Sequence, residues 1–472
     1  MMATTETSLL GLRTVTTSGS SCERTPARRR PASSLRMWRR AGALAIAATL
    51  LTGCVNTKFK TDALVQSFVI ADEPRAASIG RDVLNQGGRA GDAAVAMALA
   101  MSASLPSRVG LAGGGVCVLF DATKKEARTV DFLPRPAGAG GAAMPTMLRG
   151  LYAVQALAGV QRWEQVIAPA EQLAQFSPGV SRALTQDLAA FGNRLAPDSE
   201  IRKHFLAGGA VPAVGALVSQ PELSATLSIL RRSGVGAFYN GPLATTVAQG
   251  LGVDPAALRA YQPRVTGARS VSLGLVSLHL PDTDLSESGA ALVQAWNAAA
   301  ELPPAQRAAR VASALGATGQ GATAAGAGLM VIDRDENGVA CALTQGAPFG
   351  AGRSIAGTGV LAAQGVSSGG FGTPALVANA IVGRTLFAGV GTANGDDGPA
   401  AGPAALLTAA LPAALDGAQG DAILANRPAS APGRVNLVAC QVSVENGIRY
   451  CQSGTDPRGN GLAVVVESIR ER

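Results

Sequence analysis

The sequence predicts an α/β fold in which packed β-sheets lie between layers of helices. Three observations lead to this prediction. The 472 residues are 47% hydrophobic, which is enough for a large core. Helical apolar spacing dominates from residue 76 to about 240. Strand-like apolar runs lie within this region and recur beyond residue 329, so we expect sheets and helices to share one core.

The first half of the chain contains most of the predicted helices. Two Ala-rich helices are expected at 77–86 and 91–104, and the double glycine Gly87-Gly88 ends the first of them. Two strands, at 116–121 and 127–132, follow. Further helices with apolar residues at i, i+3 and i+4 are expected at 145–157, 163–176, 181–190 and 220–233.

The second half of the chain contains most of the predicted strands. Residues 270–281 alternate between apolar and polar side chains, as a half-buried strand does. Strands are also expected at 329–333 and 339–344, on either side of a polar turn, and a loop rich in Gly and Ser spans 346–373. The remaining predicted elements are strand-like segments at 375–382 and 385–391 and helices at 288–299, 303–315 and 402–415.

The net charge does not indicate a nucleic-acid partner. The whole chain has a formal charge of +8, but residues 1–53 hold eight Arg against two acidic residues, a net of +6. The remaining 32 basic and 30 acidic residues give only +2. We therefore expect no basic face for nucleic acid.

The basic excess lies where a secretion signal needs it. Residues 37–53 combine a positive start with an apolar run at 41–51, which is too short for a permanent membrane span. Leu51-Thr52-Gly53-Cys54 matches a bacterial lipobox, in which the cysteine thiol is diacylated. We predict a lipoprotein signal peptide at 37–53 and anchoring to the bilayer through Cys54. The alternative is an ordinary signal peptide that ends near a cysteine.

The organisation of the chain follows from this signal. Residues 1–36 lie upstream of it and are interpreted as a leader without structure, with Met37 as a second candidate for the translation start. Residues 54–75 are expected to be a tether, and 76–472 a single domain. Asn56 stands where inner-membrane lipoproteins usually carry Asp, so we expect attachment to the outer membrane, facing the periplasm.

Cysteine placement agrees with an oxidising compartment. Cys440 and Cys451 flank a segment with Asn446-Gly447 near its centre, which predicts a hairpin and a disulfide across it. Two free buried thiols are the alternative. Cys117 and Cys341 lie in apolar strand-like runs and are expected to be small core residues.

Metal and cofactor sites are not indicated by the residue types. The chain has only two histidines, His204 and His279, far apart in the sequence, and no Cys-x-x-Cys pair. We expect no metal and no cofactor.

Several sequence blocks occur in the order and at the spacing of one enzyme family. They include residues 80–102, the triple glycine at 113–115, and Met144 to Leu151. Further blocks are Trp163 with Pro169-Ala170, and residues 220–223, 236–244 and 258–261. Together they resemble the γ-glutamyltransferase (γ-glutamyltranspeptidase) family over roughly residues 76–400.

This resemblance implies an N-terminal-nucleophile hydrolase fold, a four-layer αββα sandwich with two stacked, mostly antiparallel sheets between helical layers. Members of the family are made as one precursor that cuts itself before a threonine. The hydroxyl of that threonine attacks a γ-glutamyl amide while its own amine serves as base. By the same resemblance, residues 76–317 are similar to the large subunit and residues 318–472 to the small one.

The resemblance breaks down where the family has its nucleophile. The family threonine begins a Thr-Thr-His segment before a strand that ends in Asp. Counting back from Asp333 places Gly326-Ala327-Gly328 there, and glycine has no side chain that could attack. Thr323 is a weak candidate for a non-standard nucleophile, and Thr344 lies close to a family hydroxyl that supports the nucleophile.

Positions that bind substrate in the family also differ. Its carboxylate-binding Arg follows an Asp-Phe pair, but here Leu133 follows Asp131-Phe132, and Arg135 stands two residues later as a weak candidate. Residues 364–367 replace the acidic residue that holds the α-amino group, residues 370–373 replace the Ser-Ser-Met motif, and residues 391–395 replace the Gly-Gly oxyanion turn.

Two functions remain open from the sequence. In the first, the protein is a membrane-anchored, catalytically inactive relative that binds a γ-glutamyl or peptide-like ligand or an envelope protein. In the second, it is an active transferase or hydrolase of glutathione-like compounds with a non-standard nucleophile such as Thr323. A processed enzyme gives two fragments split near 320–330 on a denaturing gel, and an unprocessed protein gives one chain.

Overall fold

The computed structural model describes residues 63–137, 141–177, 179–284, 325–366, 372–393, 433–442 and 449–470, with isolated residues between 294 and 425. Contacts group the chain from residue 62 onward into one compact unit. The predicted leader and signal peptide, Cys54 and Thr323 lie outside the described residues, as does most of the predicted helices at 288–299, 303–315 and 402–415. Among the described helices, none combines the length and apolar character that a bilayer crossing requires.

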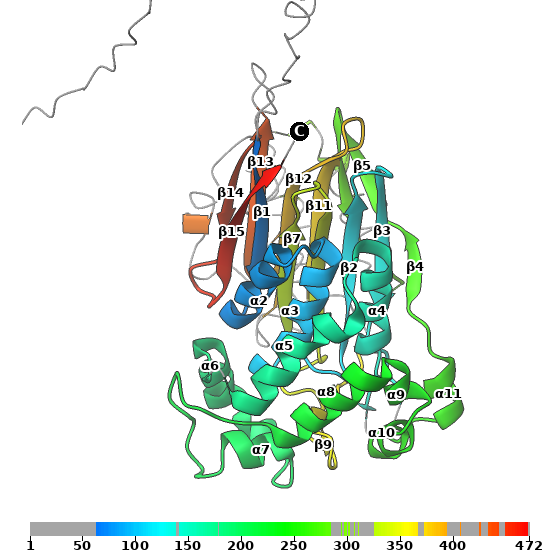
Figure 1. Ribbon diagram of the computed structural model, residues 1–472, viewed down its shortest axis with the longest axis vertical. Helices are drawn as coiled ribbons and strands as arrows, with labels where there is room; N and C mark the ends of the chain where they lie inside the picture. The colour runs from blue at the N-terminus through cyan, green and yellow to red at the C-terminus, as the bar shows by residue number, and fades with distance from the viewer. Residues whose placement is uncertain are drawn as a thin grey trace, which may run out of the picture. The chain divides into compact units, whose positions relative to one another are not determined.

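Two antiparallel sheets form the centre of the described fold (Figure 1). The first sheet contains, in spatial order, β15 (Leu462–Arg470), β1 (Ala63–Ala71), β7 (Gly326–Ile332), β8 (Gly338–Thr344), β2 (Gly114–Asp121), β3 (Glu126–Phe132) and β4 (Arg264–Gly267). The second contains β14 (Arg449–Gly454), β13 (Arg434–Val442), β12 (Arg384–Thr392), β11 (Gly372–Asn379), β6 (Val276–Leu280) and β5 (Arg269–Leu273). A short pair, β9 (Ser354–Ile355) and β10 (Val360–Leu361), lies in the segment predicted to be a loop.

Helices cover the outer face of the first sheet (Figure 1). Three of them pack directly on its strands: α2 (Pro74–Asn85), α3 (Ala90–Ser104) and α4 (Met147–Ala158). The other described helices continue beyond these: α5 (Trp163–Phe176), α6 (Arg182–Phe191), α7 (Glu200–Phe205), α8 (Pro221–Ser233), α9 (Gly236–Tyr239), α10 (Ala244–Leu251) and α11 (Pro255–Ala260).

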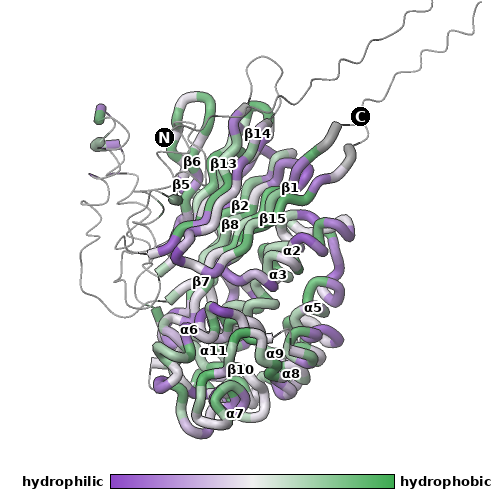
Figure 2. Tube along the Cα trace, turned by 90° about the vertical axis from the view of Figure 1, so that its left-hand side faces the viewer, coloured by the Kyte–Doolittle hydropathy of each residue, from purple (hydrophilic) through white to green (hydrophobic). Residues whose placement is uncertain are grey.

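Strand alternation separates the cores on the two faces of each sheet. In β7, Met330 and Ile332 point into the core between the sheets, whereas Leu329 and Val331 pack against the helices. A further core cluster around Leu278 covers the outer face of the second sheet. Hydrophobic residues run along the strands of both sheets in Figure 2. The predicted fold class, α/β with two stacked and mostly antiparallel sheets, is confirmed.

Helix α3 is buried over its whole length because small residues let it approach its neighbours closely. A Cβ on Gly91 would lie 2.6 Å from the carbonyl oxygen of Ala158 at the end of α4. Asp92 accepts hydrogen bonds from the backbone N–H groups of Val160 at 2.9 Å and Gln161 at 3.1 Å, which fixes the chain after α4. The block at 80–102 that resembles the family therefore serves packing.

The predicted tether at 54–75 is wrong from residue 63 onward. Residues Ala63–Ala71 form β1 within the first sheet, between β15 and β7, and α2 begins at Pro74. Residues Phe68 to Ala71 are buried on both faces of the sheet, so they lack the apolar–polar alternation that identifies a strand from sequence.

The expectation for Cys117 and Cys341 also needs correction. Both are core residues, but they are joined in a disulfide. Cys117 of β2 and Cys341 of β8 are directly opposite each other in the sheet, an arrangement that depends on strand pairing across 224 residues. The sequence around each cysteine predicts an apolar strand but does not indicate which strand pairs with it.

Candidate functional site

Several positions that the resemblance identifies lie together at one end of the strands in the two sheets. β7 begins at Gly326, β8 ends at Thr344, and these two residues are directly paired. Gly114 at the start of β2 pairs with Thr344 from the other side. From the second sheet, Ala393 at the end of β12 accepts a hydrogen bond from Gly326 N at 3.1 Å. We call this end of the two sheets, where β7 begins and β8 ends, the Gly326 edge.

The chain has no nucleophilic side chain at the start of β7. Gly326, Ala327 and Gly328 are buried and carry at most a methyl group. A Cβ on Gly328 would lie 2.9 Å from Cγ1 of Val390 in the facing sheet. A side chain here therefore requires Val390 or its strand to shift, which close packing resists.

Thr344 lies beside Gly326, as its sequence position suggested. Its hydroxyl donates to the Ala325 carbonyl oxygen at 2.6 Å and accepts from Gly346 N at 2.8 Å. Ala325 O belongs to the peptide bond that leads into Gly326. The buried hydroxyl of Thr344 is thus used to tie the start of β7 to the turn after β8.

Asp72, a buried carboxylate near the Gly326 edge, was not among the candidate residues identified from the sequence. Its Oδ2 accepts from Gly328 N at 2.7 Å and from Thr392 Oγ1 at 3.3 Å, and its Oδ1 accepts from Asn436 Nδ2 at 2.6 Å. These three uncharged donors come from β7, β12 and β13, so Asp72 links both sheets to the end of β1. The residue lies in the segment that was expected to be a tether.

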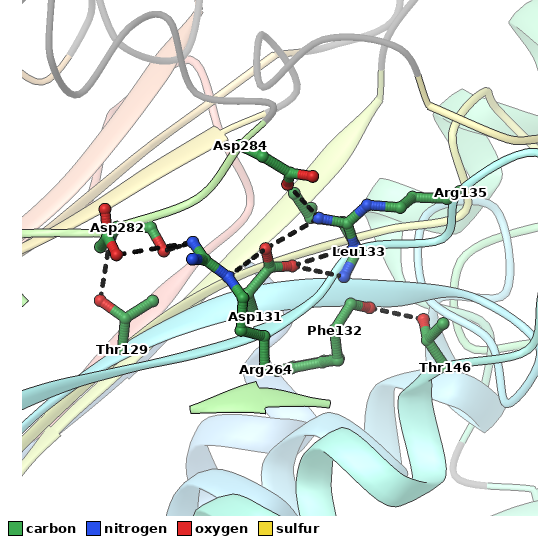
Figure 3. Close-up of polar contacts among 9 residues, drawn as sticks. All are labelled: Thr129, Asp131, Phe132, Leu133, Arg135, Thr146, Arg264, Asp282 and Asp284. Atoms are coloured by element: carbon green, nitrogen blue, oxygen red, sulfur yellow. Dashed lines mark hydrogen bonds and ion pairs between the residues drawn. The ribbon is translucent and has the colours of Figure 1, made fainter. Parts of the chain in front are cut away.

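Arg135, the candidate for binding a substrate carboxylate, is already paired with carboxylates of the protein (Figure 3). Its Nη2 lies 2.9 Å from Asp131 Oδ2 and also contacts Asp284. Asp131 is fully buried and accepts from Leu133 N at 3.1 Å. Arg264 Nε approaches the same Asp131 oxygen at 3.9 Å.

The network continues with alternating charges. Arg264 Nη2 donates to the Asp282 carbonyl oxygen at 2.6 Å and lies 3.5 Å from its carboxylate, and Arg269 Nη2 lies 2.9 Å from Asp282 Oδ1. Three arginines and three aspartates thus neutralise one another across β3, β4, β5 and the segment after β6. Figure 3 shows this chain from Asp282 to Arg135.

The pairing also sets the charge states. Burial disfavours the Arg135 cation, but the hydrogen bonds and charges of Asp131 and Asp284 outweigh burial and raise the pKa of Arg135. Burial raises the pKa of Asp284 in isolation, yet the Arg135 guanidinium holds that pKa below its ordinary value. Arg135 therefore stays charged and its charge is answered internally.

Leu133, which the sequence resemblance placed at the position of the family arginine, is part of the core. Its side chain is 1% exposed and belongs to the cluster between the two sheets, together with Val116 and Val366. An apolar side chain in this position cannot bind a carboxylate.

The other replaced positions serve the backbone framework. Gln364 is exposed, and its N–H donates to the Gln345 carbonyl oxygen at 2.9 Å. Thr373 is buried and directly paired with Gly391 in regular β11–β12 ladder. The segment expected to replace the oxyanion turn is therefore part of strand β12 up to Thr392. Gly391 and Thr392 are paired with neighbouring strands of the sheet.

Family-like blocks pack against one another around Tyr239. Its hydroxyl donates to Pro145 O at 2.9 Å and accepts from Arg149 N at 3.3 Å, and the Arg149 guanidinium carbon lies 4.3 Å from the ring centroid. Arg149 Nη1 donates to Arg259 O at 2.8 Å. Burial raises the pKa of Tyr239, so its hydroxyl stays protonated. Three blocks distant in sequence thereby hold one another in place.

The remaining predicted positions lie apart from this edge. Cys440 and Cys451 are directly paired on β13 and β14 and joined in a disulfide. His204 Nε2 lies 2.6 Å from Glu222, and His279 Nδ1 lies 2.8 Å from Ser270 Oγ. Among the residues that the structure describes, no group of three His, Cys, Asp or Glu side chains could hold a metal ion.

Comparisons with known proteins agree with this architecture. A family model described as gamma-glutamyltranspeptidase matches residues 76–316, just over half of the chain. Glutathione hydrolase 7 of Homo sapiens is 34% identical over 193 residues, which are 37% of this chain and 29% of that protein. The glutathione hydrolase proenzyme of Bacillus subtilis (strain 168) is 29% identical over 202 residues, 38% of this chain and 34% of that protein.

The chain thus spans about a third of the length of these curated relatives. Among solved structures, cephalosporin acylase from Bacillus halodurans superposes with a TM-score of 0.68 at 16% identity, covering 86% of this chain and 96% of that one. At this identity the likeness concerns the fold alone.

Proposed function

Because the chain belongs to the γ-glutamyltranspeptidase family, we propose that it is a lipid-anchored member that does not catalyse γ-glutamyl transfer and acts by binding. The observation that carries this proposal is Gly326 at the start of β7, where the family needs a side-chain hydroxyl. A nucleophile cannot be supplied by a hydrogen atom.

Two further features support the absence of turnover. The Gly328 position is crowded, because a Cβ there would meet Val390 Cγ1 at 2.9 Å. Arg135, which stands two residues after the position expected for the family's carboxylate-binding arginine, is neutralised by Asp131 and Asp284. Nucleophile and substrate recognition are therefore lost together.

The first experiment measures self-cleavage and hydrolysis in the purified wild-type protein. We expect one unbroken chain on a denaturing gel and no p-nitroaniline release from γ-glutamyl-p-nitroanilide, with the Bacillus subtilis glutathione hydrolase as the positive control. Cleavage before a hydroxyl-bearing residue, with Thr323 as the obvious position, together with hydrolysis above background would establish the active alternative instead.

The second experiment addresses the anchor. The lipobox at 51–54 supports diacylation of Cys54, and Asn56 favours the outer membrane. We expect an alkynyl palmitate probe to label the wild-type protein in the outer-membrane fraction and to leave Cys54→Ala unlabelled. Equal labelling of both proteins would refute the anchor.

The third experiment concerns the ligand. Glutathione and short γ-glutamyl peptides are titrated calorimetrically into the purified protein, with alanine tripeptide as the matched non-γ-glutamyl probe. Heat with both kinds of peptide supports a peptide-like ligand, and heat with γ-glutamyl compounds alone supports a retained γ-glutamyl subsite. Absence of heat with all of them rules out small peptides and leaves an envelope protein as the partner.

A further inference from the structure

The opposite end of the strands, away from the Gly326 edge, carries an exposed apolar patch. Leu275 lies in the turn between β5 and β6, and Ile381 and Val382 lie in the turn between β11 and β12. Their exposed fractions are 75%, 68% and 60%. We call these three residues the hairpin-tip patch. Large apolar side chains this exposed and this close together indicate a surface that another phase or molecule covers.

The two turns are neighbours because their strands pair. β6 pairs with β11 with Ser277 opposite Ala378, so Leu275 emerges beside the start of the β11–β12 turn. Figure 1 shows both turns at the same end of the second sheet. The three residues of the patch therefore lie on two neighbouring hairpin turns.

Hydrogen bonds tie the backbone of the β11–β12 turn to its own sheet and to the other one. Asn379 Oδ1 accepts from the N–H groups of Ile381 at 3.0 Å and Val382 at 3.3 Å. Lys125 Nζ donates to Ile381 O at 2.6 Å from the β2–β3 turn of the other sheet. The turn is thus tied to both sheets while Ile381 and Val382 stay exposed.

The described chain begins at the same edge. β1 ends at Ala71, opposite Leu329 near the Gly326 edge, so its first residue Ala63 lies at the hairpin-tip end, beside Arg470 of β15. Figure 1 shows the start of β1 and the β11–β12 turn at the top of the view. Cys54 precedes Ala63 by nine residues. Nine residues span at most about 30 Å, so an acyl chain on Cys54 keeps this end near the bilayer.

We propose that the hairpin-tip patch rests in the headgroup–acyl boundary of the membrane that holds Cys54. This inference rests on the proposed lipid anchor and adds the orientation of the domain. Burying the three side chains in the boundary removes apolar surface from water, and the anchor has already restricted the domain to the membrane surface. The Gly326 edge then faces away from the membrane.

The surrounding charges predict that lipid charge matters little. Residues 121–128, 333–337 and 379–384, which form the turns around the patch, hold five basic and five acidic residues. A balanced edge gains little from anionic headgroups. Insertion is therefore expected in phosphatidylcholine vesicles as well as in vesicles that contain phosphatidylglycerol.

The test places a tryptophan in the patch of the full lipoprotein. Leu275→Trp is reconstituted into phosphatidylcholine vesicles, with Leu217→Trp as the matched control, since Leu217 is 77% exposed and precedes α8, which lies away from the hairpin turns in Figure 1. Flotation of the vesicles is measured first. Quenching by phosphatidylcholine brominated near the headgroup is measured next, with wild-type fluorescence as the background.

We expect the wild-type protein and all variants to float with the vesicles. We expect brominated lipid to quench the fluorescence of Leu275→Trp at least about twofold more strongly than that of Leu217→Trp, because only a residue at the boundary contacts the bromines. Ile381→Trp repeats the measurement in the second turn. Flotation with equal quenching in both variants leaves the anchor standing and overturns the orientation. A blue-shifted but unquenched Leu275→Trp shows that a second copy or another protein covers the patch and also overturns it. Failure to float refutes the anchor and the orientation together.

Discussion

Asp131 and Arg135 form an ion pair at 2.9 Å in which the Asp131 side chain is completely buried and the Arg135 side chain is 36% exposed. Arg135, the candidate for binding a substrate carboxylate, has a partner in Asp131 and a second in Asp284. A substrate carboxylate would have to displace both, at the cost of leaving a buried charge unpaired.

The ion pair predicts a difference between two aspartates. Asp131→Ala leaves Arg135 and Arg264 without their buried partner and Leu133 N without its acceptor. We expect it to lower the free energy of unfolding by about 1–3 kcal/mol. Asp284→Ala removes a carboxylate that is 64% exposed, and should cost less than about 1 kcal/mol. Urea midpoints measure both, and equal losses would show that the buried carboxylate has no special role.

We expect that a hydroxyl at the nucleophile position alone does not restore activity. We expect Gly326→Thr to release no p-nitroaniline from γ-glutamyl-p-nitroanilide, because Leu133 and the neutralised Arg135 offer no site for the substrate carboxylate. The wild-type protein is the control. Measurable γ-glutamyl hydrolysis by this single variant would contradict the proposed loss of substrate recognition.

The space at Gly328 can be tested by a double-mutant cycle. Gly328→Ala brings a methyl group within 2.9 Å of Val390 Cγ1 and is expected to cost about 1–3 kcal/mol of unfolding free energy. Gly267→Ala is the control, because a Cβ there meets nothing within 4 Å. In a Val390→Ala background, the cost of Gly328→Ala should fall. An unchanged cost would mean that the facing sheet is not what excludes the side chain.

The two disulfides should differ in their contribution to stability. Cys117–Cys341 closes a loop of 224 residues and Cys440–Cys451 one of 11. The chain-entropy argument gives about 5 kcal/mol for the first and about 3 kcal/mol for the second. Replacing both cysteines of each pair by alanine, followed by thermal unfolding, should therefore destabilise the protein more for the 117–341 pair. The reverse order would exclude loop closure as the dominant cause.

Acid sensitivity should depend on His279. This histidine is 6% exposed, stacks on Phe120 at 5.9 Å and has a buried Nε2 without a hydrogen-bond partner. Burial lowers the pKa of His279 to about 4. The unfolded chain takes up this proton near pH 6.5. Stability is therefore fully present above about pH 6.5 and is lost as the pH falls through about 4, by at most about 3 kcal/mol.

The matched variant for this prediction is His279→Gln. Its urea midpoint should change less between pH 7 and pH 4 than that of the wild type. Glu73 and Asp333 titrate in the opposite sense, because burial raises their pKa values and their contribution is lost as the pH rises. They are present in both proteins and cancel in the comparison. Identical pH profiles would remove His279 as the cause.

Much of the helical layer could be predicted from the sequence. Helices at 91–104 and 163–176 were expected where α3 and α5 lie, because an Ala-rich run and an apolar 3.6-residue period are local signals. The strand at 339–344 was expected within one residue of β8. The absence of a side-chain hydroxyl at Gly326 could also be predicted from the sequence, since it depends on residue type alone.

Local sequence signals were enough to identify the residue types at the start of β7 and to predict packed sheets against helices. The tertiary structure alone decided the partners: that 63–71 is a buried strand, that Cys117 faces Cys341, that Asp72 joins both sheets, and that Arg135 is neutralised by Asp131 and Asp284. The difference arises from the sequence separation of the residues that interact. Residue chemistry and helical periodicity are local, whereas strand pairing and charge pairing bring together residues up to several hundred positions apart, which no local pattern encodes.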